Sequence, residues 1–324
     1  MNSKTTFQTT LNMFDDNLAS KPIQYQKILV RETKKSFLKC PFNYIGGKYK
    51  ILPQLYSVFP KNPDIFVDLF GGGFNVGLNS DANKIYYNDQ LTPLVDLFKY
   101  LQTNKKENII KYIEETISKY DLSKENKESY IKFRNYYNNS TEKNPLDLYI
   151  LVTYSFNYQF RFNNNGEYNN PHGTNRSQFT KNMKNRLIQC IDILHEKNIL
   201  FYNKDFMDFN LKCLTENSLV YCDPPYLITT GSYNDGNRGF KNWTKKEEKD
   251  LLKLLSRLNK NNIKFALSNV TIHDGKRNEI LIDWIEENDY STISIESDYT
   301  NSNYQKKNKN NKENKEVLII NYWL

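Results

Sequence analysis

The segment "LVYCDPPYLI" (residues 219–228) places an aspartate, two prolines and a tyrosine directly after a run of apolar residues. The run is long enough for a short buried strand, but Pro224 and Pro225 have no N–H to donate to a sheet, so the strand has to end before them. Ligands of open α/β sheets bind outside the carboxyl ends of the strands. The segment therefore predicts that Asp223 and the ring of Tyr226 are held rigidly at a ligand-binding edge.

Strand and helix signals alternate along much of the chain. The segment "DIFVDLFGGGFNVGLN" (64–79) is typical of a strand, a glycine turn and the start of a helix, and "KIYYNDQLTPLVDLFKYLQ" (84–102) of a second strand and an amphipathic helix. This alternation predicts an α/β fold with a Rossmann-like, mostly parallel sheet. Later strands are expected in "ILFYNKDF", "IKFALSNV", "STISIES" and "EVLIINYWL".

Changes in composition and in hydrophobic pattern divide the chain into three parts. Residues 1–36 are polar and lack a period, so we expect an irregular N-terminal arm. The sheet-forming segments lie in 37–102 and 200–324, which we predict to form one catalytic domain. Between them, 103–199 contains helical stretches rich in Lys and Glu and then a Gly/Asn-rich loop, as expected of an inserted recognition domain. The tract 306–315 should form a basic loop before the last strand.

Composition narrows the classes of partner. The net charge of +8 indicates a polyanion, because lysines that neutralise phosphates release counterions; a merely solvated lysine surface is the alternative. The four cysteines and three histidines are scattered, so we expect reduced thiols, no metal site and a cytoplasmic location. No apolar run is long enough to cross a membrane and no signal peptide is evident.

The glycine turn suggests a nucleoside ligand. Gly71 to Gly73 let a ligand approach the backbone closely, although Val76 stands where the dinucleotide fingerprint requires a third glycine. Asp89 ends the next strand, where an acid can bind both ribose hydroxyls. The pattern favours a nucleoside without a diphosphate, such as S-adenosylmethionine, over a simple turn.

The residues after the strand suit methyl transfer to a nucleobase amine. Such an amine is a poor nucleophile because its lone pair is delocalised into the ring, and two fixed acceptors favour the tetrahedral form that can attack. The carboxylate of Asp223 and the carbonyl of Pro224 can supply these acceptors, while Tyr226 can stack on a base withdrawn from a duplex. We expect direct in-line displacement without a covalent enzyme intermediate, since Cys222 precedes the acid and should point elsewhere.

In their order, these motifs resemble the Dam family of DNA adenine N6-methyltransferases (D12 class), most closely its phage-type members around "DPPYLIT". The resemblance begins near Pro41 and implies a class I S-adenosylmethionine methyltransferase fold. It also implies catalytic roles for Asp223, Pro224, Pro225 and Tyr226. The cofactor contacts that it implies are Tyr44, Lys48, Asp68, Phe70, Gly71, Gly73, Asp89, Asp205, Phe206 and Asp223.

The insert contains "RFNNNGEYNNPHG" (161–173), which is similar to a family element, although His172 stands where an aromatic ring is usual. The segment "YNDGNRGFKNW" (233–243) is longer than its counterpart in phage-type members. Arginine can read guanine and asparagine can read adenine; alternatively the arginines contact phosphates and the neighbouring phenylalanines are core. The candidate DNA contacts are Tyr158, Arg161, Asn163 and Arg176.

The sequence thus predicts an S-adenosylmethionine-dependent methyltransferase that modifies N6 of a flipped-out adenine in double-stranded DNA, with a GATC-like site as the default target. A cognate restriction endonuclease is a candidate partner, and a monomer or weak dimer in a bacterial or phage-infected cell is expected. Two alternatives stay open at this point: a catalytically silent DNA-binding subunit, and an N-methyltransferase that acts on RNA or protein.

Overall fold

A computed structural model describes residues 6–10, 23, 25–29, 36–229, 243–296 and 315–323. The predicted basic loop at 306–315 lies outside the described residues except for Lys315, and the long segment 233–243 does so except for Trp243.

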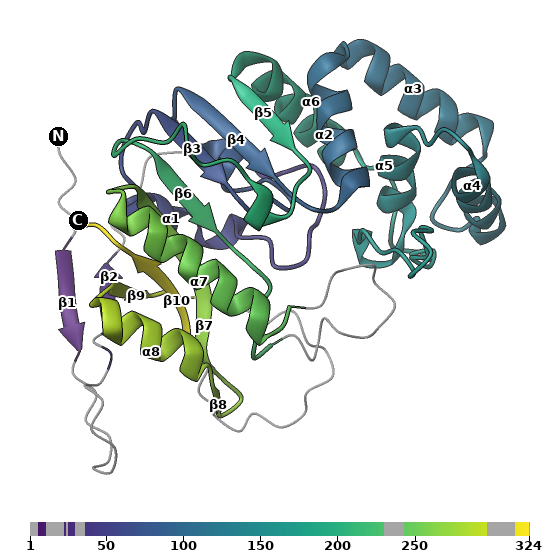
Figure 1. Ribbon diagram of the computed structural model, residues 1–324. Helices are drawn as coiled ribbons and strands as arrows, with labels where there is room; N and C mark the ends of the chain where they lie inside the picture. The colour runs from purple at the N-terminus through teal and green to yellow at the C-terminus, as the bar shows by residue number, and fades with distance from the viewer. Residues whose placement is uncertain are drawn as a thin grey trace.

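The described strands form one sheet in the order β1-β2-β9-β10-β7-β6-β3-β4-β5, with β8 paired to β7 (Figure 1). The run β7-β6-β3-β4-β5 is parallel throughout, and β10 lies antiparallel between β7 and β9. The mostly parallel α/β sheet expected from the sequence is confirmed. The strands are β1 (Thr6–Thr10), β2 (Tyr25–Leu29), β3 (Ile65–Asp68), β4 (Lys84–Asn88), β5 (Ile199–Tyr202), β6 (Leu219–Cys222), β7 (Lys264–His273), β8 (Lys276–Arg277), β9 (Ser291–Ser294) and β10 (Lys315–Ile320).

Helices cover both faces of the sheet and form two hydrophobic cores. One core joins a face of the sheet to α1, α2, α5 and α6, and the other joins the opposite face to α7 and α8. β6 is buried on both faces, as its continuous apolar sequence requires. The helices are α1 (Leu52–Val58), α2 (Thr92–Thr103), α3 (Lys106–Lys119), α4 (Lys127–Asn139), α5 (Pro145–Tyr154), α6 (Lys181–Glu196), α7 (Lys245–Lys260) and α8 (Glu279–Asn288), with 3-10 turns at η1 (Tyr49–Ile51), η2 (Gly77–Asn79), η3 (Phe156–Tyr158) and η4 (Phe206–Asp208).

The N-terminal segment corrects one expectation, because 1–36 contains two strands and is not wholly irregular. β1 pairs antiparallel with β2, and β2 pairs parallel with β9, so this segment extends the sheet. The Tyr25 hydroxyl lies 3.3 Å from Thr271 Oγ1 in β7. These strands are short and polar, so β2 depends on its pairing with β9 and β1 on its pairing with β2, and neither leaves a periodic signal in the sequence.

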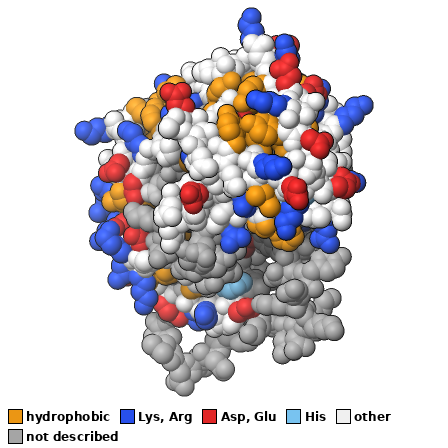
Figure 2. Space-filling view, turned by 90° about the vertical axis from the view of Figure 1, so that its right-hand side faces the viewer, with side chains coloured by type: hydrophobic (Ala, Val, Ile, Leu, Met, Phe, Trp, Pro, Cys, Tyr) orange, Lys and Arg blue, Asp and Glu red, His pale blue; other side chains and the backbone are white. Residues whose placement is uncertain are grey.

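Four helices, α3 to α6, lie within the predicted insert, beyond the β4–β5 end of the sheet (Figure 1). α5 was not predicted, and every residue from Leu146 to Tyr154 is buried, because α2, α3 and α4 pack around it. Viewed from this side, Lys and Arg side chains are interspersed with Asp and Glu and with small apolar patches (Figure 2). None of the helices among the described residues is long and apolar enough to cross a membrane.

Candidate active site at the carboxyl edge of the sheet

The predicted site residues of the sheet come together because β3, β4, β5 and β6 are parallel and end at the same edge. Asp68 is the last residue of β3, Asp89 follows β4, and Asp223 follows β6. The Asn88 side chain joins three of these strand ends, since its Nδ2 donates to the carbonyls of Leu69 (3.1 Å) and Lys204 (3.0 Å). The edge is therefore fixed by side-chain hydrogen bonds as well as by the ladders.

The glycine turn packs tightly against two tyrosine rings. A side chain at Gly71 would collide with the Tyr87 ring, and one at Gly72 (φ 45°) or Gly73 would press on Tyr44. Asp89 holds the turn, because its Oδ2 accepts from the Gly72 N–H at 2.9 Å. The turn thus requires glycine and presents its backbone between Tyr44 and the sheet.

The helix expected after this turn is only the 3-10 turn η2 (Gly77–Asn79), which corrects the sequence prediction. Gly72 and Phe74 both have positive φ (45° and 57°), which an α-helix does not allow. The Asp68 carboxylate accepts from the Gly77 N–H at 2.9 Å and takes the place of a helical carbonyl. The segment therefore stays compact without forming a helix.

Three carboxyl groups at this edge have raised pKa values, each mainly because of burial. The pKa of Asp68 rises to about 8, opposed by the Gly77 N–H and raised further by the charges of Asp223 and Asp89. The pKa of Asp89 is raised despite the N–H donors of Leu91, Gly72 and Gln90. A positively charged ligand beside these carboxyl groups would favour their ionised forms and so be bound more strongly.

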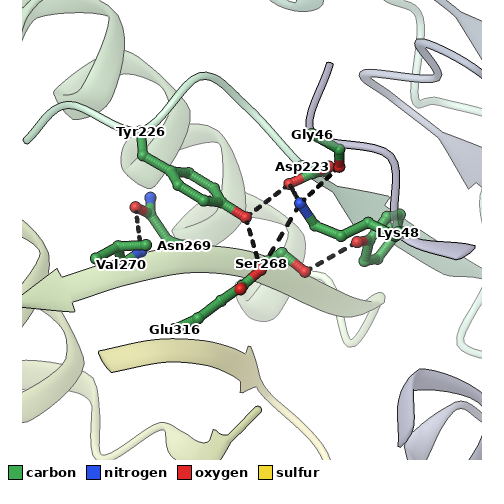
Figure 3. A network of polar contacts seen from close by, with 9 residues as sticks. Gly46, Lys48, Asp223, Tyr226, Ser268, Asn269, Val270 and Glu316 are labelled. Carbon is green, nitrogen blue, oxygen red and sulfur yellow. Dashed lines mark hydrogen bonds and ion pairs between the residues drawn. The ribbon is translucent and has the colours of Figure 1, made fainter. Parts of the chain in front are cut away.

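Asp223 lies in a polar network (Figure 3). Its Oδ1 is 2.9 Å from Lys48 Nζ and 3.0 Å from the Tyr226 hydroxyl, and Lys48 also donates to the Gly46 carbonyl at 3.1 Å. Burial raises the pKa of Asp223, whereas the positive charge of Lys48 lowers it. Pro224 is buried and Pro225 is exposed, so the prolines fix the backbone at the boundary between core and surface.

Sequence reasoning missed Glu316, which belongs to the same network. Its Oε1 lies 3.2 Å from the Tyr226 hydroxyl and 3.7 Å from Lys48 Nζ. Glu316 is near the start of β10, and because β10 runs antiparallel to β7, its start lies at the carboxyl edge of the parallel strands. Lys315 and Glu316 at the start of a strand are typical of a solvent-exposed strand end. No local signal in the sequence therefore identified Glu316 as a site residue.

An aromatic cluster lies beside the glycine turn. Phe70 and Phe206 are 5.4 Å apart between ring centroids, and the Trp243 ring lies 5.7 Å from each. Trp243 was not predicted; its indole N–H donates to the buried carboxylate of Glu248 at 2.6 Å. Asp205 lies beside this cluster, where Oδ1 accepts from the Met207 N–H and Oδ2 from Gln90 Nε2.

The predicted DNA contacts lie on the insert. A narrow hairpin is closed by a bridge between Phe162 and Tyr168, and Phe160 anchors it because its ring lies 5.3 Å from Phe42 and 6.2 Å from Tyr44. Phe160 and Phe162 are both buried, as the alternative interpretation of this segment expected. The hairpin that carries Arg161 is thus attached directly to the segment that covers the glycine turn.

The four candidate side chains have different surroundings. Asn163 shapes the hairpin turn, since its Oδ1 accepts from the N–H groups of Asn165 and Glu167. The Tyr158 hydroxyl donates to the carbonyl of Arg176, whose side chain is exposed. Arg161 Nε is buried without a hydrogen-bond partner among the residues that the structure describes.

His172 occupies a buried position. Its ring lies 5.1 Å from the Tyr130 ring, and its two nitrogens contact Thr174 Oγ1 and the Ser123 carbonyl, each at 3.1 Å. The histidine therefore packs as the usual aromatic ring would. No group of His, Cys, Asp and Glu side chains suited to a metal ion occurs within the described part of the chain.

A profile of the D12 class N6 adenine-specific DNA methyltransferases matches residues 44–317. The chain belongs to this family. The match begins at Tyr44 and ends just after Glu316, so it includes the glycine turn, the insert and the Asp223 network. The resemblance inferred from the motifs is confirmed.

Curated relatives agree with this assignment. The chain is 51% identical over 298 residues to the type II methyltransferase M.FokI of Planomicrobium okeanokoites and 46% identical over 303 residues to the modification methylase StsI of Streptococcus sanguinis. These alignments cover 92% and 94% of this chain but only 45% of each relative, so the chain spans under half of their length. The DNA adenine methylase of Escherichia coli K12 is 25% identical over 242 residues, which are 72% of this chain and 80% of that protein.

Proposed function

We propose that this chain transfers a methyl group from S-adenosylmethionine to N6 of an adenine that is flipped out of double-stranded DNA. The observation that carries the proposal is the position of Asp223. A partly buried carboxylate follows directly after β6, next to the strand that leads into the glycine turn and in contact with Tyr226, within a chain of an adenine-specific DNA methyltransferase family. Family membership favours this function over methylation of RNA or protein.

The residues at the glycine turn fit S-adenosylmethionine, which supplies an electrophilic methyl group on a positively charged sulfur. Gly71 and Gly73 leave no room for side chains, and the acids Asp68, Asp89 and Asp223 lie at the same edge, where a positively charged ligand would favour their ionised forms. Each oxygen of the Asp89 carboxylate accepts one backbone N–H and retains a lone pair for a ribose hydroxyl. Tyr44 and Lys48 would close the site from the N-terminal side. Asp205 and Phe206 would bracket the adenine of the cofactor, and the backbone around Phe70 would support its methionine part.

The chain's own groups would prepare the target amine. Asp223 and the Pro224 carbonyl would accept its hydrogens and favour a tetrahedral nitrogen whose lone pair points at the methyl carbon. The ring of Tyr226 would stack on the extruded base, and Pro225 would restrict the backbone conformation of the loop that carries this ring. We infer direct displacement, because Cys222 is fully buried and takes no part in the Asp223 network.

We assign 37–102 and 200–324 to catalysis and 103–199 to recognition of DNA. In this assignment Arg161 and Arg176 contact the DNA, together with Tyr158 and Asn163, from a hairpin that packs on the catalytic part through Phe160. M.FokI is named a type II methyltransferase and StsI a modification methylase, so a cognate restriction endonuclease is the candidate functional partner. The site of action would be the cytoplasm of a bacterial or phage-infected cell, where the DNA is.

Transfer of a tritiated methyl group from S-adenosylmethionine to duplex DNA, RNA and protein tests the proposal. We expect incorporation into duplex DNA alone, and single-molecule sequencing of DNA from a methylation-free host that expresses the chain should show N6-methyladenine at one sequence. DNA binding without incorporation into any substrate would indicate a silent subunit. Incorporation into RNA or protein alone would contradict the proposed substrate.

A further inference from the structure

We propose that Glu316 is a positioning residue for methyl transfer, which shares Lys48 and Tyr226 with Asp223 and keeps the Asp223 carboxylate a strong acceptor for the target amine. This inference rests on the proposed function and adds a residue from a strand that neither motifs nor spacing had connected with catalysis.

The geometry places the same two donors between two carboxylates (Figure 3). Lys48 Nζ lies 2.9 Å from Asp223 Oδ1 and 3.7 Å from Glu316 Oε1, and the Tyr226 hydroxyl lies 3.0 Å and 3.2 Å from the same atoms. A phenol has one proton, so it can donate fully to only one of the two acids at a time. Each hydrogen bond that Glu316 takes from these donors leaves Asp223 Oδ1 more available.

The charges of the network lead to the same conclusion. Lys48 is 4% and Glu316 is 9% exposed, so water screens their charges only weakly. Lys48 with Asp223 alone would form a neutral ion pair, whereas Lys48 with both acids leaves one net negative charge. As the methyl group reaches the amine, positive charge develops on its nitrogen, and a net negative site stabilises that charge.

The local backbone explains how a strand residue reaches this position. The register between β10 and β7 shifts between Lys315 and Glu316, which pair with Ile272 and Val270. The extra residue of this bulge is Thr271 of β7, so β10 keeps its regular alternation from Glu316 onward, and bulges are common next to active sites. Leu318 and Ile320, which share the face of Glu316, lie in the core that also contains Tyr221. Glu316 therefore sits at the end of a buried row, on the side of the sheet that faces Lys48.

The experiment compares Glu316→Gln and Glu316→Ala with the wild type in kcat, KM and pH dependence of methyl transfer. Glutamine keeps an oxygen that can accept from Tyr226 but loses the charge. We expect about a ten- to hundredfold lower kcat for Glu316→Gln, because the contacts with Lys48 and Tyr226 lose their charge-assisted strength, with KM for S-adenosylmethionine changed by no more than about threefold. Glu316→Ala should be slower still.

The pH dependence of methyl transfer distinguishes a positioning role of Glu316 from a loss of activity caused by a damaged fold. Because the negative charge of Glu316 raises the pKa of Asp223, Glu316→Gln should move the acidic limb of the activity profile to lower pH. Lys48→Met should move the limb to higher pH, because the Lys48 charge lowers the same pKa. The charged and titratable groups that face Asp223 are Lys48, Tyr226, Glu316, Asp68 and Tyr221.

The pKa of Asp223 can also be measured directly, without relying on enzyme activity. Carbon-13 NMR of aspartate-labelled protein, with Asp223→Asn to assign the signal, should show the Asp223 pKa lower in Glu316→Gln and higher in Lys48→Met. Glu279→Gln is the control, since this exposed glutamate pairs with Arg277 on the surface. We expect wild-type kcat and an unchanged Asp223 pKa for this variant.

Two results would overturn the role of Glu316: a kcat of Glu316→Gln within about twofold of the wild type, or an Asp223 pKa that stays the same or rises. A wild type that methylates none of the three substrates would instead refute the proposed function. In that case the NMR titration still decides whether Glu316 acts on Asp223.

Discussion

In the proposed function, Asp223 is the side chain that accepts the hydrogens of the target amine. It is the acid that the end of β6 places beside two prolines, and its Oδ1 accepts from Tyr226 and pairs with Lys48. An acceptor fixed in this way needs no reorganisation when the amine arrives, which is why preorganised groups contribute strongly to catalysis.

Replacement of Asp223 by alanine should therefore abolish methyl transfer and leave the fold and DNA affinity largely intact. The expected loss is about 3–4 kcal/mol of transition-state stabilisation, comparable to removing an oxyanion-type group. Tritiated-methyl transfer measures the loss, and Asp223→Asn, which keeps the shape without the charge, should be nearly as inactive. A turnover above about a tenth of the wild-type value in Asp223→Ala would refute the assigned role.

In the proposed function, Asp68 should make the binding of the cationic cofactor depend on pH. Its pKa is raised to about 8 by burial, so the carboxyl is largely protonated at neutral pH. A positive ligand nearby favours the ionised form and lowers this pKa, so binding should release protons and affinity should rise as pH approaches 8. Titration calorimetry of S-adenosylmethionine binding near neutral pH, in two buffers of different ionisation enthalpy, counts the protons.

Asp68→Asn is the matched variant for that measurement, because the amide oxygen can still accept from the Gly77 N–H while the titrating group is gone. The number of protons released should fall in this variant. An unchanged number would show that the protons come from other groups, with Asp89 and Asp223 as the first candidates, since burial raises both of their pKa values.

Among the elements, β7 and α7 hold the aromatic side of the candidate site in place. The buried Glu248 on α7 accepts hydrogen bonds from Trp243, from Asn269 on β7 and from Asn278 at the start of α8. One carboxylate thus ties together two helices, the central sheet and an aromatic ring that packs on Phe70 and Phe206. Burial raises the pKa of Glu248, and the three N–H donors oppose that shift.

The hairpin of the insert is the element on which recognition is predicted to depend. If Arg161 reads a base, Arg161→Ala should weaken binding by about 1–3 kcal/mol at the methylated sequence and much less on an unrelated duplex. Arg161→Lys should behave like the alanine variant, because lysine cannot form the planar, bidentate contact. Fluorescence anisotropy with the two duplexes measures both effects. An equal fall on the two duplexes would identify Arg161 as a phosphate contact.

At the scale of the whole molecule, 45 basic and 37 acidic residues give a net charge of +8. On the insert side, Lys and Arg side chains are mixed with Asp and Glu over much of the face, and more of them lie along the left edge of the view (Figure 2). Attraction to the DNA phosphates should therefore come both from individual Lys and Arg side chains that contact them and from the net positive charge of the whole protein.

Affinity for duplex DNA should fall as salt rises, with a slope of about −0.9 in log K against log salt for each phosphate contact. Arg176→Gln should reduce the slope by about one contact if the exposed Arg176 binds a phosphate. Lys111→Gln is the control, because Lys111 is an exposed residue of α3 that pairs with Glu115. If both variants reduce the slope equally, the effect comes from net charge alone. If Arg176→Gln leaves the slope unchanged, Arg176 does not contact a phosphate.

The sequence alone determined the parallel core of the fold and most of the site, because both depend on local patterns. Prolines end β6 wherever it lies, adjacent glycines permit the turn beside Tyr87, and acids that follow parallel strands must meet at one edge. These features follow from covalent geometry and from the shared direction of the strands. The family resemblance rested on the same motifs.

Tertiary structure alone decided the features that depend on contacts between distant segments. β2 is a strand because β9 offers it a partner, and β1 pairs in turn with β2. The turn after Gly73 stays 3-10 because the buried Asp68 captures the Gly77 N–H. Glu316 enters the site because the antiparallel β10 begins at the edge where the parallel strands end. No local pattern in the sequence encodes these pairings, since their free energy comes from burial and hydrogen bonds that exist only after the chain has folded.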